Sequence, residues 1–355
     1  MPSSHVVNGD NSVHSYSRHS IYQRQAEDVV REKIRKAIVE KLDVRNFSST
    51  SNTICVADYG CAVGDNTFIS MQHTLGAIKQ KFYSQCPKSE MPEFQVFLND
   101  QVSNDFNALF TLIPQEKQYF VAGVPGSFHN QLFPKSSIHF AHTSCSLHWL
   151  SEMPEGLEDV DSLAYNKGRI HYAGCPDEVV RAYASQFDRD AEKFLKARAD
   201  ELVPGGMLVI TMPGIRDGMP CIETPIGLMH DFMGSIFMDM AKEGLVSEGD
   251  VDSFNLPIYS ASPGEMLGLV ERNGEFNIER LELADPTPRL DDPVDMEAWT
   301  LHVRAAMDGM FLNHFKIEVV DEMFERLIGK LDELSPLVES CKKDAAQLFV
   351  VLTRK

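Results

Sequence analysis

The stretch Val56-Ala-Asp58-Tyr-Gly60-Cys61-Ala-Val-Gly64-Asp65-Asn66 decides which kind of fold this chain adopts. An apolar run at 54–57 ends in an acid, and a glycine-rich turn follows at once. Glycines let backbone N–H groups approach a ligand closely, so this arrangement is typical of a site for a nucleoside-bearing cofactor. Taken alone, the same D-x-G pattern also fits a turn that only joins a strand to a helix.

The position of the acid distinguishes this turn from a dinucleotide site. Dinucleotide-binding folds place their glycines as G-x-G-x-x-G around a pyrophosphate, whereas here Asp58 precedes a G-x-x-x-G spacing. A carboxylate at the end of the strand favours a cofactor that carries positive charge, such as the sulfonium of S-adenosylmethionine. The sequence therefore disfavours a dehydrogenase.

Composition and charge narrow the class further. The chain has 355 residues, 43% of them hydrophobic, which is enough for one large domain or a domain with an appended cap. A formal net charge of −19 disfavours nucleic acid and anionic membrane surfaces as partners and favours a small molecule. The seven cysteines form no C-x-x-C pair, which argues against a zinc site and for reduced thiols. Residues 1–13 lack an apolar signal core and no run reaches about 18 apolar residues, so we expect a cytoplasmic protein without a membrane segment.

Apolar runs alternate with helical stretches along most of the chain. Strand-like runs lie at 54–57, 94–98, 137–142, 207–211 and 347–352, and an amphipathic helix is predicted over 20–42. This alternation predicts an α/β fold with a parallel sheet. We expect residues 1–14 to be disordered, 15–212 with 332–355 to form the core, and 213–331 to form a mostly helical cap over the carboxyl edge of the sheet.

A second acid follows the next predicted strand. The run 94–98 is followed by Asn99-Asp100, which places a carboxylate beside Asp58 at the same sheet edge. Such a carboxylate can accept hydrogen bonds from both hydroxyls of a ribose. Asp100 equally fits the N-cap of a helix that begins near residue 104.

Six motifs, taken in order, identify a family. They are Ser15-Tyr16-Ser17 to Tyr22-Gln23, the turn from Asp58 to Asn66, Val124-Pro-Gly-Ser-Phe128, Ser146-Leu-His-Trp149-Leu-Ser, Tyr165-Asn166-Lys-Gly, and Val251-Asp252-Ser-Phe254-Asn255-Leu-Pro257. Together they resemble the plant family of small-molecule carboxyl and N-methyltransferases known as the SABATH family, nearly end to end. The resemblance implies a class I, Rossmann-like methyltransferase sheet with a helical cap, S-adenosylmethionine as cofactor, a small carboxylic acid as acceptor, and a homodimer.

The resemblance also implies a role for individual residues. The cofactor set comprises Tyr16, Ser20, Asp58, Gly60, Cys61 and Asn66 at its methionine end, Asp100 and Gln101 at the ribose and adenine, Ser127 and Phe128 at the adenine ring, and Cys145. Gln23 and Trp149 would orient the acceptor carboxylate, because an amide and an indole are uncharged donors that suit an apolar pocket. A carboxylic acid with a pKa near ~4 is already ionised, so no general base is expected. Ser20 and Gln23 also have capping-box spacing, and Trp149 also fits an ordinary core position.

One further group resembles a magnesium site described for some members of the family. Asn166, Asp252, Asn255 and the carbonyl of Phe254 would form a hard oxygen shell. A structural turn that ties the cap to the sheet explains the same residues. Methyl transfer to a carboxylate requires no metal.

The acceptor set comprises Tyr16, Gln23, Cys145, His148, Trp149, His230 and His302. Family members that take aromatic acids often have an aromatic residue where this chain has Cys145, so the smaller side chain leaves room. Three histidines suit a hydroxylated acid, since each sugar hydroxyl buried without a partner costs about 1–3 kcal/mol. The chain most resembles the loganic acid methyltransferase branch, which makes loganic acid or a related iridoid acid the expected acceptor. Other acids (salicylate, benzoate, jasmonate or a farnesoate-like acid), N-methylation of the caffeine-pathway type, and a non-catalytic cofactor-binding paralogue remain alternatives.

Overall fold

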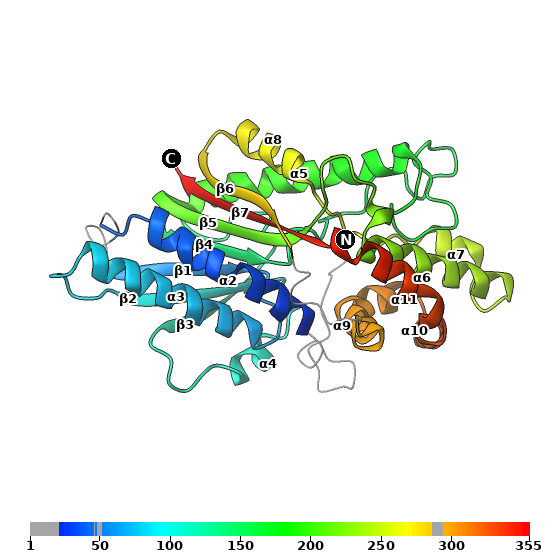
Figure 1. The fold of residues 1–355 in the computed structure, drawn as a ribbon, viewed down its shortest axis with the longest axis horizontal. Coiled ribbons are helices and arrows are strands. Elements are labelled where there is room, and N and C mark those ends of the chain that lie inside the picture. Colours follow the sequence, from blue (N-terminus) through cyan, green and yellow to red (C-terminus); the bar gives the residue numbers. More distant parts are fainter. Residues whose placement is uncertain (1–20, 46, 48–51, 286–293) are drawn as a thin grey trace.

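A single sheet organises the molecule. The structure is a computed structural model that describes residues 21–45, 47, 52–285 and 294–355; the expected disorder of residues 1–14 lies outside them. Within the described residues, seven strands form one sheet in the order β3-β2-β1-β4-β5-β7-β6 (Figure 1). Their bounds are β1 Thr53–Tyr59, β2 Glu93–Asp100, β3 Phe120–Pro125, β4 Ile138–Ser144, β5 Leu202–Gly214, β6 Phe276–Ala284 and β7 Ala346–Arg354.

The sheet is mixed, and the parallel arrangement predicted from the sequence holds for β1 to β5. Strands β1 to β5 pair in parallel, whereas β7 runs antiparallel to both β5 and β6. An apolar run is compatible with either strand direction when both of its faces are buried, so the sequence pattern did not reveal the reversal. The pattern also missed β3 and β6, because these edge strands are largely half-exposed and lack a continuous apolar run.

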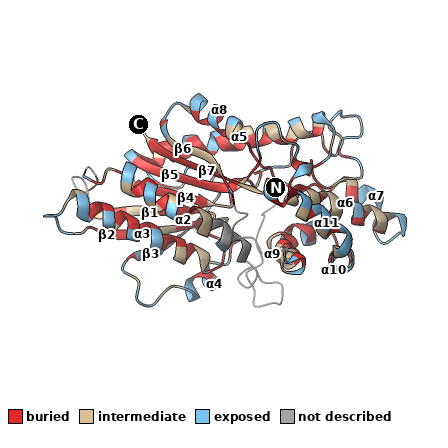
Figure 2. Cartoon of the chain, in the orientation of Figure 1, coloured by how far each residue is buried: buried red, intermediate tan, exposed pale blue. Residues whose placement is uncertain are grey.

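Helices cover both faces of the sheet. Helices α2 (Ile21–Lys41) and α3 (Asn66–Gln85) pack on one face, and α5 (Asp177–Glu201) and α8 (Pro263–Asn273) pack on the other. Strand β7 shows the alternation: Leu348 and Val350 join the α5 and α8 side, while Phe349 and Val351 join the α2 and α3 side. The central strands β1, β4, β5 and β7 are therefore mostly buried on both faces, as Figure 2 shows.

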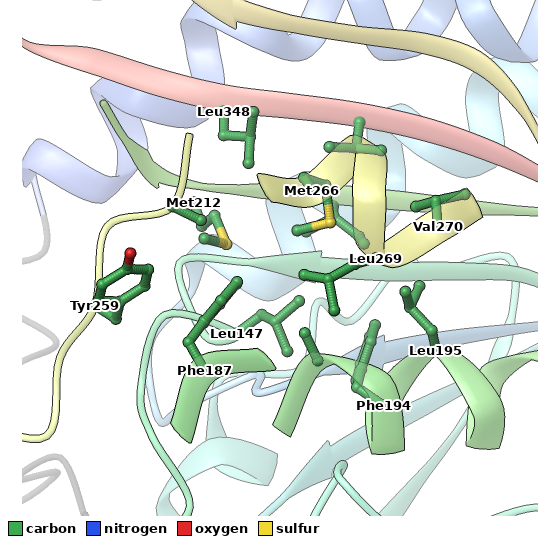
Figure 3. Packing of buried hydrophobic residues seen from close by; sticks show 14 of the residues in the cluster. Leu147, Phe187, Phe194, Leu195, Met212, Tyr259, Met266, Leu269, Val270 and Leu348 are labelled. Carbon is green, nitrogen blue, oxygen red and sulfur yellow. The ribbon is translucent and has the colours of Figure 1, made fainter. Parts of the chain in front are cut away.

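The core between α5 and α8 is closely packed. Figure 3 shows Phe194 and Leu195 of α5 facing Leu269 and Val270 of α8 beneath β7. Helix α8 begins with a capping box and ends at Gly274 in the left-handed conformation, which is a common way to stop a helix before a strand. This core fixes α5 behind the sheet.

A second group of helices lies beyond the carboxyl ends of β1, β2 and β4. Helices α6 (Pro225–Lys242), α7 (Glu248–Asp252), α9 (Met296–His314), α10 (Ile317–Gly329) and α11 (Leu331–Cys341) enclose a separate, methionine-rich cluster (Figure 1). The remaining short helices are α4 (Phe106–Thr111) and the 3-10 turns η2 (Cys221–Glu223) and η4 (Lys342–Asp344). The segment 213–331 also supplies α8 and β6 to the sheet layers, and α11 continues the helical group past residue 331. The division into a core and a cap stays a prediction.

Two further features of the described chain concern long apolar helices, which could span a membrane, and paired cysteines, which could form disulfides. No helix in it is long and apolar enough to span a membrane. All seven cysteines are free.

Candidate active site

A cavity lies where the strand order reverses, between β1 and β4. Parallel α/β sheets bind ligands at such a point, outside the carboxyl ends of the strands. The cavity has a volume of about 800 Å³. We call the part of the lining that follows the strand ends up to Ser146 the sheet side; it includes Gly60, Ala62, Asp100, Gln101, Ser127, Phe128, His129, Asn130, Ser144, Cys145 and Ser146. We call the remaining lining the cap side; it includes His148, Trp149, Ser151, Ile226, His230, Ile258, Trp299, His302, Val303, Met307 and Met310.

The turn after β1 requires glycine at one position. Gly60 has φ +83°, and a Cβ there would lie 2.1 Å from Oγ of Ser146. The N–H groups of Gly60 and Cys61 both donate to the carbonyl of Asn99, at 2.9 and 3.0 Å. The turn is thus tied to the end of β2, and the backbone of Gly60 forms part of the cavity wall.

Asp100 stands at the end of β2 and lines the cavity. One carboxylate oxygen accepts from the N–H of Ala62 and the other from the N–H of Gln101, each at 2.7 Å. Burial raises the pKa of Asp100 to about 6, and the two backbone hydrogen bonds oppose that rise. The N-cap of α4 is Asp105, so the alternative role of Asp100 as a helix cap is excluded.

Three other predicted cofactor residues are absent from the lining of the cavity in the described chain. Asp58 is buried and accepts from Oγ1 of Thr67 at 2.5 Å, while its other oxygen lies 3.0 Å from Nδ1 of His142. Cys61 is buried, and burial raises its thiol pKa well above the ordinary value. Asn66 begins α3 and accepts from Nε of Arg24 at 3.0 Å. None of these three predicted residues is among the cavity-lining residues of the described chain.

The loop after β3 brings Ser127 and Phe128 to the cavity, as predicted. The ring of Phe128 packs edge-on against Phe194 of α5, with centroids 6.0 Å apart. This contact holds an aromatic face at the wall, where stacking on an adenine ring is possible. His129 and Asn130, which the sequence analysis did not name, line the same stretch.

The segment after β4 supplies Cys145, His148 and Trp149. Cys145 has φ +51°, an uncommon conformation for a non-glycine residue, and its N–H donates to the carbonyl of Thr211 at 2.8 Å. This observed backbone strain lies at the cavity. The rings of His148 and Trp149 lie 5.1 Å apart, and Trp149 also forms an isolated bridge with Ile258. The half-buried indole is thereby held in the wall.

Two histidines on the cap side are buried and neutral. Burial lowers the pKa of His230 to about 3, and burial together with the neighbouring His230 lowers that of His148 to about 3. Both ring nitrogens of His230 and Nδ1 of His148 have no hydrogen-bond partner among the residues that the structure describes. Neutral imidazoles can donate one hydrogen bond and accept another, so they suit hydroxyl groups.

Helix α9 presents one face to the cavity. Trp299, His302, Val303, Ala306, Met307 and Met310 recur at helical spacing and all line it. Of these, only His302 was predicted. The sequence could have indicated that the missed residues lie together, because their three- and four-residue intervals place them on a single helix face.

The predicted magnesium group forms a hydrogen-bonded turn. Nδ2 of Asn166 donates to Oδ1 of Asn255 at 2.6 Å, and the carboxylate of Asp252 accepts from Tyr165 and from the N–H of Gly168, each at 2.6 Å. Phe254 packs its ring against Phe311 of α9. The side-chain oxygens of Asp252 and Asn255 already accept protein hydrogen bonds, so these residues form a structural turn without a metal, and the magnesium site stays a prediction.

Three predicted residues cannot be placed. Tyr16 and Ser20 lie outside the described residues. Gln23 lies in the first turn of α2, but its side chain is outside the described part of the structure. The proposed pairing of Gln23 with Trp149 therefore stays a prediction.

Comparison with known proteins identifies the family. A family model for SAM dependent carboxyl methyltransferases matches residues 1–355. A loganic acid O-methyltransferase of Catharanthus roseus is 42% identical over 354 residues, covering 99% of this chain and 94% of that protein. A farnesoic acid carboxyl-O-methyltransferase of Arabidopsis thaliana is 37% identical over 354 residues, covering 100% of both chains. A 3,7-dimethylxanthine N-methyltransferase of Camellia sinensis is 35% identical, covering 88% of this chain and 86% of that one.

A solved structure agrees with these sequence matches. A loganic acid methyltransferase with SAH superimposes with a TM-score of 0.94 at 42% identity, covering 98% of both chains. The predicted fold class and the predicted family are thereby confirmed. This chain belongs to the SAM-dependent carboxyl methyltransferases, the enzymes that its six sequence motifs resemble.

Proposed function

We propose that the protein transfers the methyl group of S-adenosylmethionine to the carboxylate of a hydroxylated small acid, with loganic acid or a related iridoid acid as the best candidate. When bound, S-adenosylmethionine supplies an activated methyl group, whose bond to sulfur breaks as a carboxylate oxygen attacks, leaving S-adenosylhomocysteine and a methyl ester.

The sheet side of the cavity suits the cofactor. Asp100 would accept the ribose hydroxyls, and Phe128 would contact the adenine ring. Gly60 and its tight turn would let the backbone approach the methionine end. These roles rest on the family resemblance and on the cavity lining, and no metal takes part in them.

The cap side would hold the acceptor. The indole N–H of Trp149 would donate to one carboxylate oxygen and leave the other to attack. The acid arrives ionised, so alignment in a largely apolar pocket supplies most of the acceleration, for which effective molarities are worth about 7–11 kcal/mol at best. Gln23 would be the second donor if its side chain reaches the same oxygen.

The environment of His230 is the observation that favours a hydroxylated acid as the acceptor. His230 is buried in the cavity wall and neutral, and neither of its ring nitrogens has a partner within the described part of the chain. A buried polar group without a partner costs free energy, and a ligand hydroxyl would remove that cost. A flat apolar acid would leave these nitrogens unsatisfied.

A second candidate has its own support. Trp299, Val303 and Met307 give α9 an apolar face, which also suits a prenyl-type acid like that named for the 37% identical relative. N-methylation of a xanthine is a further alternative, because a relative 35% identical carries that name. A homodimer is proposed from the family resemblance and is testable by analytical ultracentrifugation.

The test is incubation of the purified protein with methyl-labelled S-adenosylmethionine and a panel of acceptors. The panel comprises loganic, secologanic, salicylic, benzoic, jasmonic, indole-3-acetic and farnesoic acids, with xanthines. Base-labile product formed mainly from loganic or secologanic acid supports the proposal. Turnover confined to farnesoic acid or to a xanthine contradicts it, and cofactor binding without any product favours a non-catalytic paralogue.

A further inference from the structure

Two fully buried polar groups on α5 hold the two loops that line the cavity. Asp190 and Arg198 lie eight residues apart on the sheet-facing side of this helix, and each is 0% exposed. At ~1.5 Å per residue they are separated by about 12 Å along the helix axis. Neither was predicted from the sequence, and neither lines the cavity within the described chain.

Arg198 and Glu201 form a buried pair behind the loop after β3. The guanidinium binds both carboxylate oxygens, at 2.8 and 2.9 Å, and donates to the carbonyls of Phe128 (2.6 Å) and Asn130 (3.0 Å). Glu201 in turn accepts from the N–H groups of Leu132 (2.5 Å) and Phe133 (3.1 Å). The pair therefore fixes four backbone groups of a loop whose other side is the cavity wall.

The same pair reaches the end of β1. Oε2 of Glu201 accepts from the hydroxyl of Tyr59 at 2.7 Å, and the guanidinium lies 4.0 Å from the centroid of the Tyr59 ring. Tyr59 immediately precedes Gly60. The adenine-side loop and the methionine-side turn thus share one buried anchor.

Asp190 anchors the other loop. Its carboxylate accepts from the N–H of Ser151 at 2.8 Å, from Oγ of Ser151 at 2.5 Å, and from Nε2 of Gln186 at 3.0 Å. Ser151 lies two residues after Trp149 and lines the cavity. On the opposite side, the N–H of Leu150 donates to the carbonyl of Pro257 at 2.8 Å, so the segment that carries Trp149 is held between α5 and the cap connection.

We propose that α5 supplies positioning residues for both halves of the cavity: Arg198 with Glu201 for the cofactor side, and Asp190 for the acceptor side. A buried ion pair adds little stability compared with well-packed apolar side chains of similar volume. Its distinctive effect is to fix the direction of the groups that it binds. The acceptor half of this inference rests on the proposed function, whereas the cofactor half requires only that the chain bind S-adenosylhomocysteine.

The cofactor half is tested by replacing the pair with apolar side chains. The double variant Arg198→Met/Glu201→Met removes every loop contact without leaving a lone buried charge. The matched control is Glu178→Met/Arg181→Met, an exposed pair with the same three-residue spacing on the same helix. Calorimetric titration with S-adenosylhomocysteine is expected to show at least tenfold weaker binding in the first variant and less than twofold change in the control.

A destabilised variant separates positioning from general loss of stability. Leu269→Ala on α8 weakens the apolar packing against α5 and removes none of the hydrogen bonds of Asp190, Arg198 or Glu201. It is expected to lower the thermal midpoint while leaving the affinity of the folded protein for S-adenosylhomocysteine within twofold. If Leu269→Ala weakens binding as much as Arg198→Met/Glu201→Met does, the cofactor half of the inference is overturned.

The proposed role of Asp190 on the acceptor side is tested by measuring the fluorescence of Trp149. The chain has two tryptophans, so a Trp299→Phe background leaves Trp149 as the sole indole fluorophore. In that background Asp190→Leu is expected to shift the emission and at least double the acrylamide quenching constant, whereas Asp190→Asn, which keeps one acceptor for Ser151, restores most of the native signal. The control is Asp188→Leu, a half-exposed acid on the same helix.

The Asp190 and Arg198 variants must also have different effects on cofactor binding and on the acceptor. Asp190→Leu is expected to leave S-adenosylhomocysteine affinity within twofold and to raise the KM of whichever acceptor the panel identifies at least tenfold. Equal losses of cofactor affinity in the Asp190 and Arg198 variants, or no loss in either, would overturn the division of roles. If no acceptor is turned over, the fluorescence of Trp149 and the titration still decide the inference, and only the proposed function fails.

Discussion

The two carboxylates at the sheet edge and the buried His230 on the cap side differ in how far the protein itself satisfies their hydrogen bonds. At the sheet edge, Asp58 is bound to Thr67 and His142, and Asp100 holds two backbone N–H groups. On the cap side, the buried ring nitrogens of His230 have no partner among the residues that the structure describes. The two carboxylates are therefore held in place before any ligand arrives, whereas under the proposed function an acceptor hydroxyl would supply the partner of His230.

The hydrophobic cores next to the two sides of the cavity also differ in composition. The cores on the two faces of the sheet consist mainly of branched aliphatic and aromatic side chains. The cluster among the cap helices contains seven buried methionines, namely Met229, Met233, Met240, Met296, Met307, Met310 and Met323. Methionine is unbranched and adapts to irregular shapes. The contrast is consistent with a fixed cofactor half and an acceptor half that tolerates different acids.

The largest effect is expected on the sheet side. Asp100→Leu removes the acceptor of two backbone N–H groups and, under the proposed function, the acceptor of the ribose hydroxyls. Two charge-assisted hydrogen bonds at about 1.5–3 kcal/mol each correspond to at least ~100-fold weaker binding of S-adenosylhomocysteine. Calorimetric titration measures this, and affinity within tenfold of wild type would show that the cofactor does not depend on Asp100.

The pH dependence of the same site sharpens this expectation. Since burial raises the pKa of Asp100 to about 6, the carboxylate is protonated at lower pH and loses its capacity as a double acceptor. Affinity for S-adenosylhomocysteine is therefore expected to fall as the pH drops below 6. Asp100→Asn should bind weakly at every pH; a slope equal to that of wild type would assign the titration to another group.

Trp149→Phe should affect only the acceptor side. The substitution keeps an aromatic ring in the wall but removes the indole N–H, a donor to a charged group worth about 1.5–3 kcal/mol. We expect kcat/KM for the acceptor acid to fall about 10–100-fold. Binding of S-adenosylhomocysteine should change less than twofold, and an equal loss in both measurements would mean that the indole supports the fold or the cofactor instead.

His230→Leu should change selectivity more than rate. Leaving a buried hydroxyl of the acceptor without its partner costs about 1–3 kcal/mol, so kcat/KM for a hydroxylated acid is expected to fall by about tenfold. Turnover of an apolar acid such as farnesoic acid should rise or stay unchanged. A parallel loss for both classes of acid would contradict the assignment of His230 to hydroxyl recognition.

The buried histidines also predict how stability depends on pH. His148 and His230 have folded-state pKa values of about 3, below the ordinary value of 6.5. Between those two pH values the unfolded chain binds protons that the folded chain does not, so stability is lost as the pH falls below 6.5. Each histidine contributes a slope of about 1.4 kcal/mol per pH unit. Denaturant titrations of wild type and His230→Leu should show the smaller slope in the variant, and equal slopes would refute the burial of a neutral His230.

The smallest effect is expected from metal removal. The oxygens of Asp252 and Asn255 already accept hydrogen bonds, so prolonged dialysis against a chelator should change kcat and the thermal midpoint by less than the experimental error. Asp252→Ala, in contrast, should lower the thermal midpoint measurably, because Tyr165 and the N–H of Gly168 lose their partner. Restoration of activity by Mg²⁺ after chelation would show that the turn rearranges into a metal site.

Several parts of the site could be predicted because they follow strands. Gly60, Asp100 and Cys145 each follow an apolar run or its turn, and the carboxyl ends of neighbouring parallel strands meet at one edge. Ser127 was assigned only through the family resemblance, because the strand before it, β3, lacks a continuous apolar run. The face of α9 escaped prediction because its intervals look like ordinary helix packing. Whether such a face meets a cavity or a core depends on a neighbour that is remote in sequence.

The sequence by itself determined the strand-to-turn segment around Gly60, most of the strands, the family, and ten residues that line the cavity, because these depend on local pattern and ordered motifs. Only the tertiary structure decided that β7 runs antiparallel, that Asp58 is buried and accepts a hydrogen bond from Thr67, and that α5 anchors both loops. The physical reason is the same in each case. Strand direction, burial of a charge and the partner of a buried polar group are set by contacts between segments far apart in the chain, which no local pattern encodes.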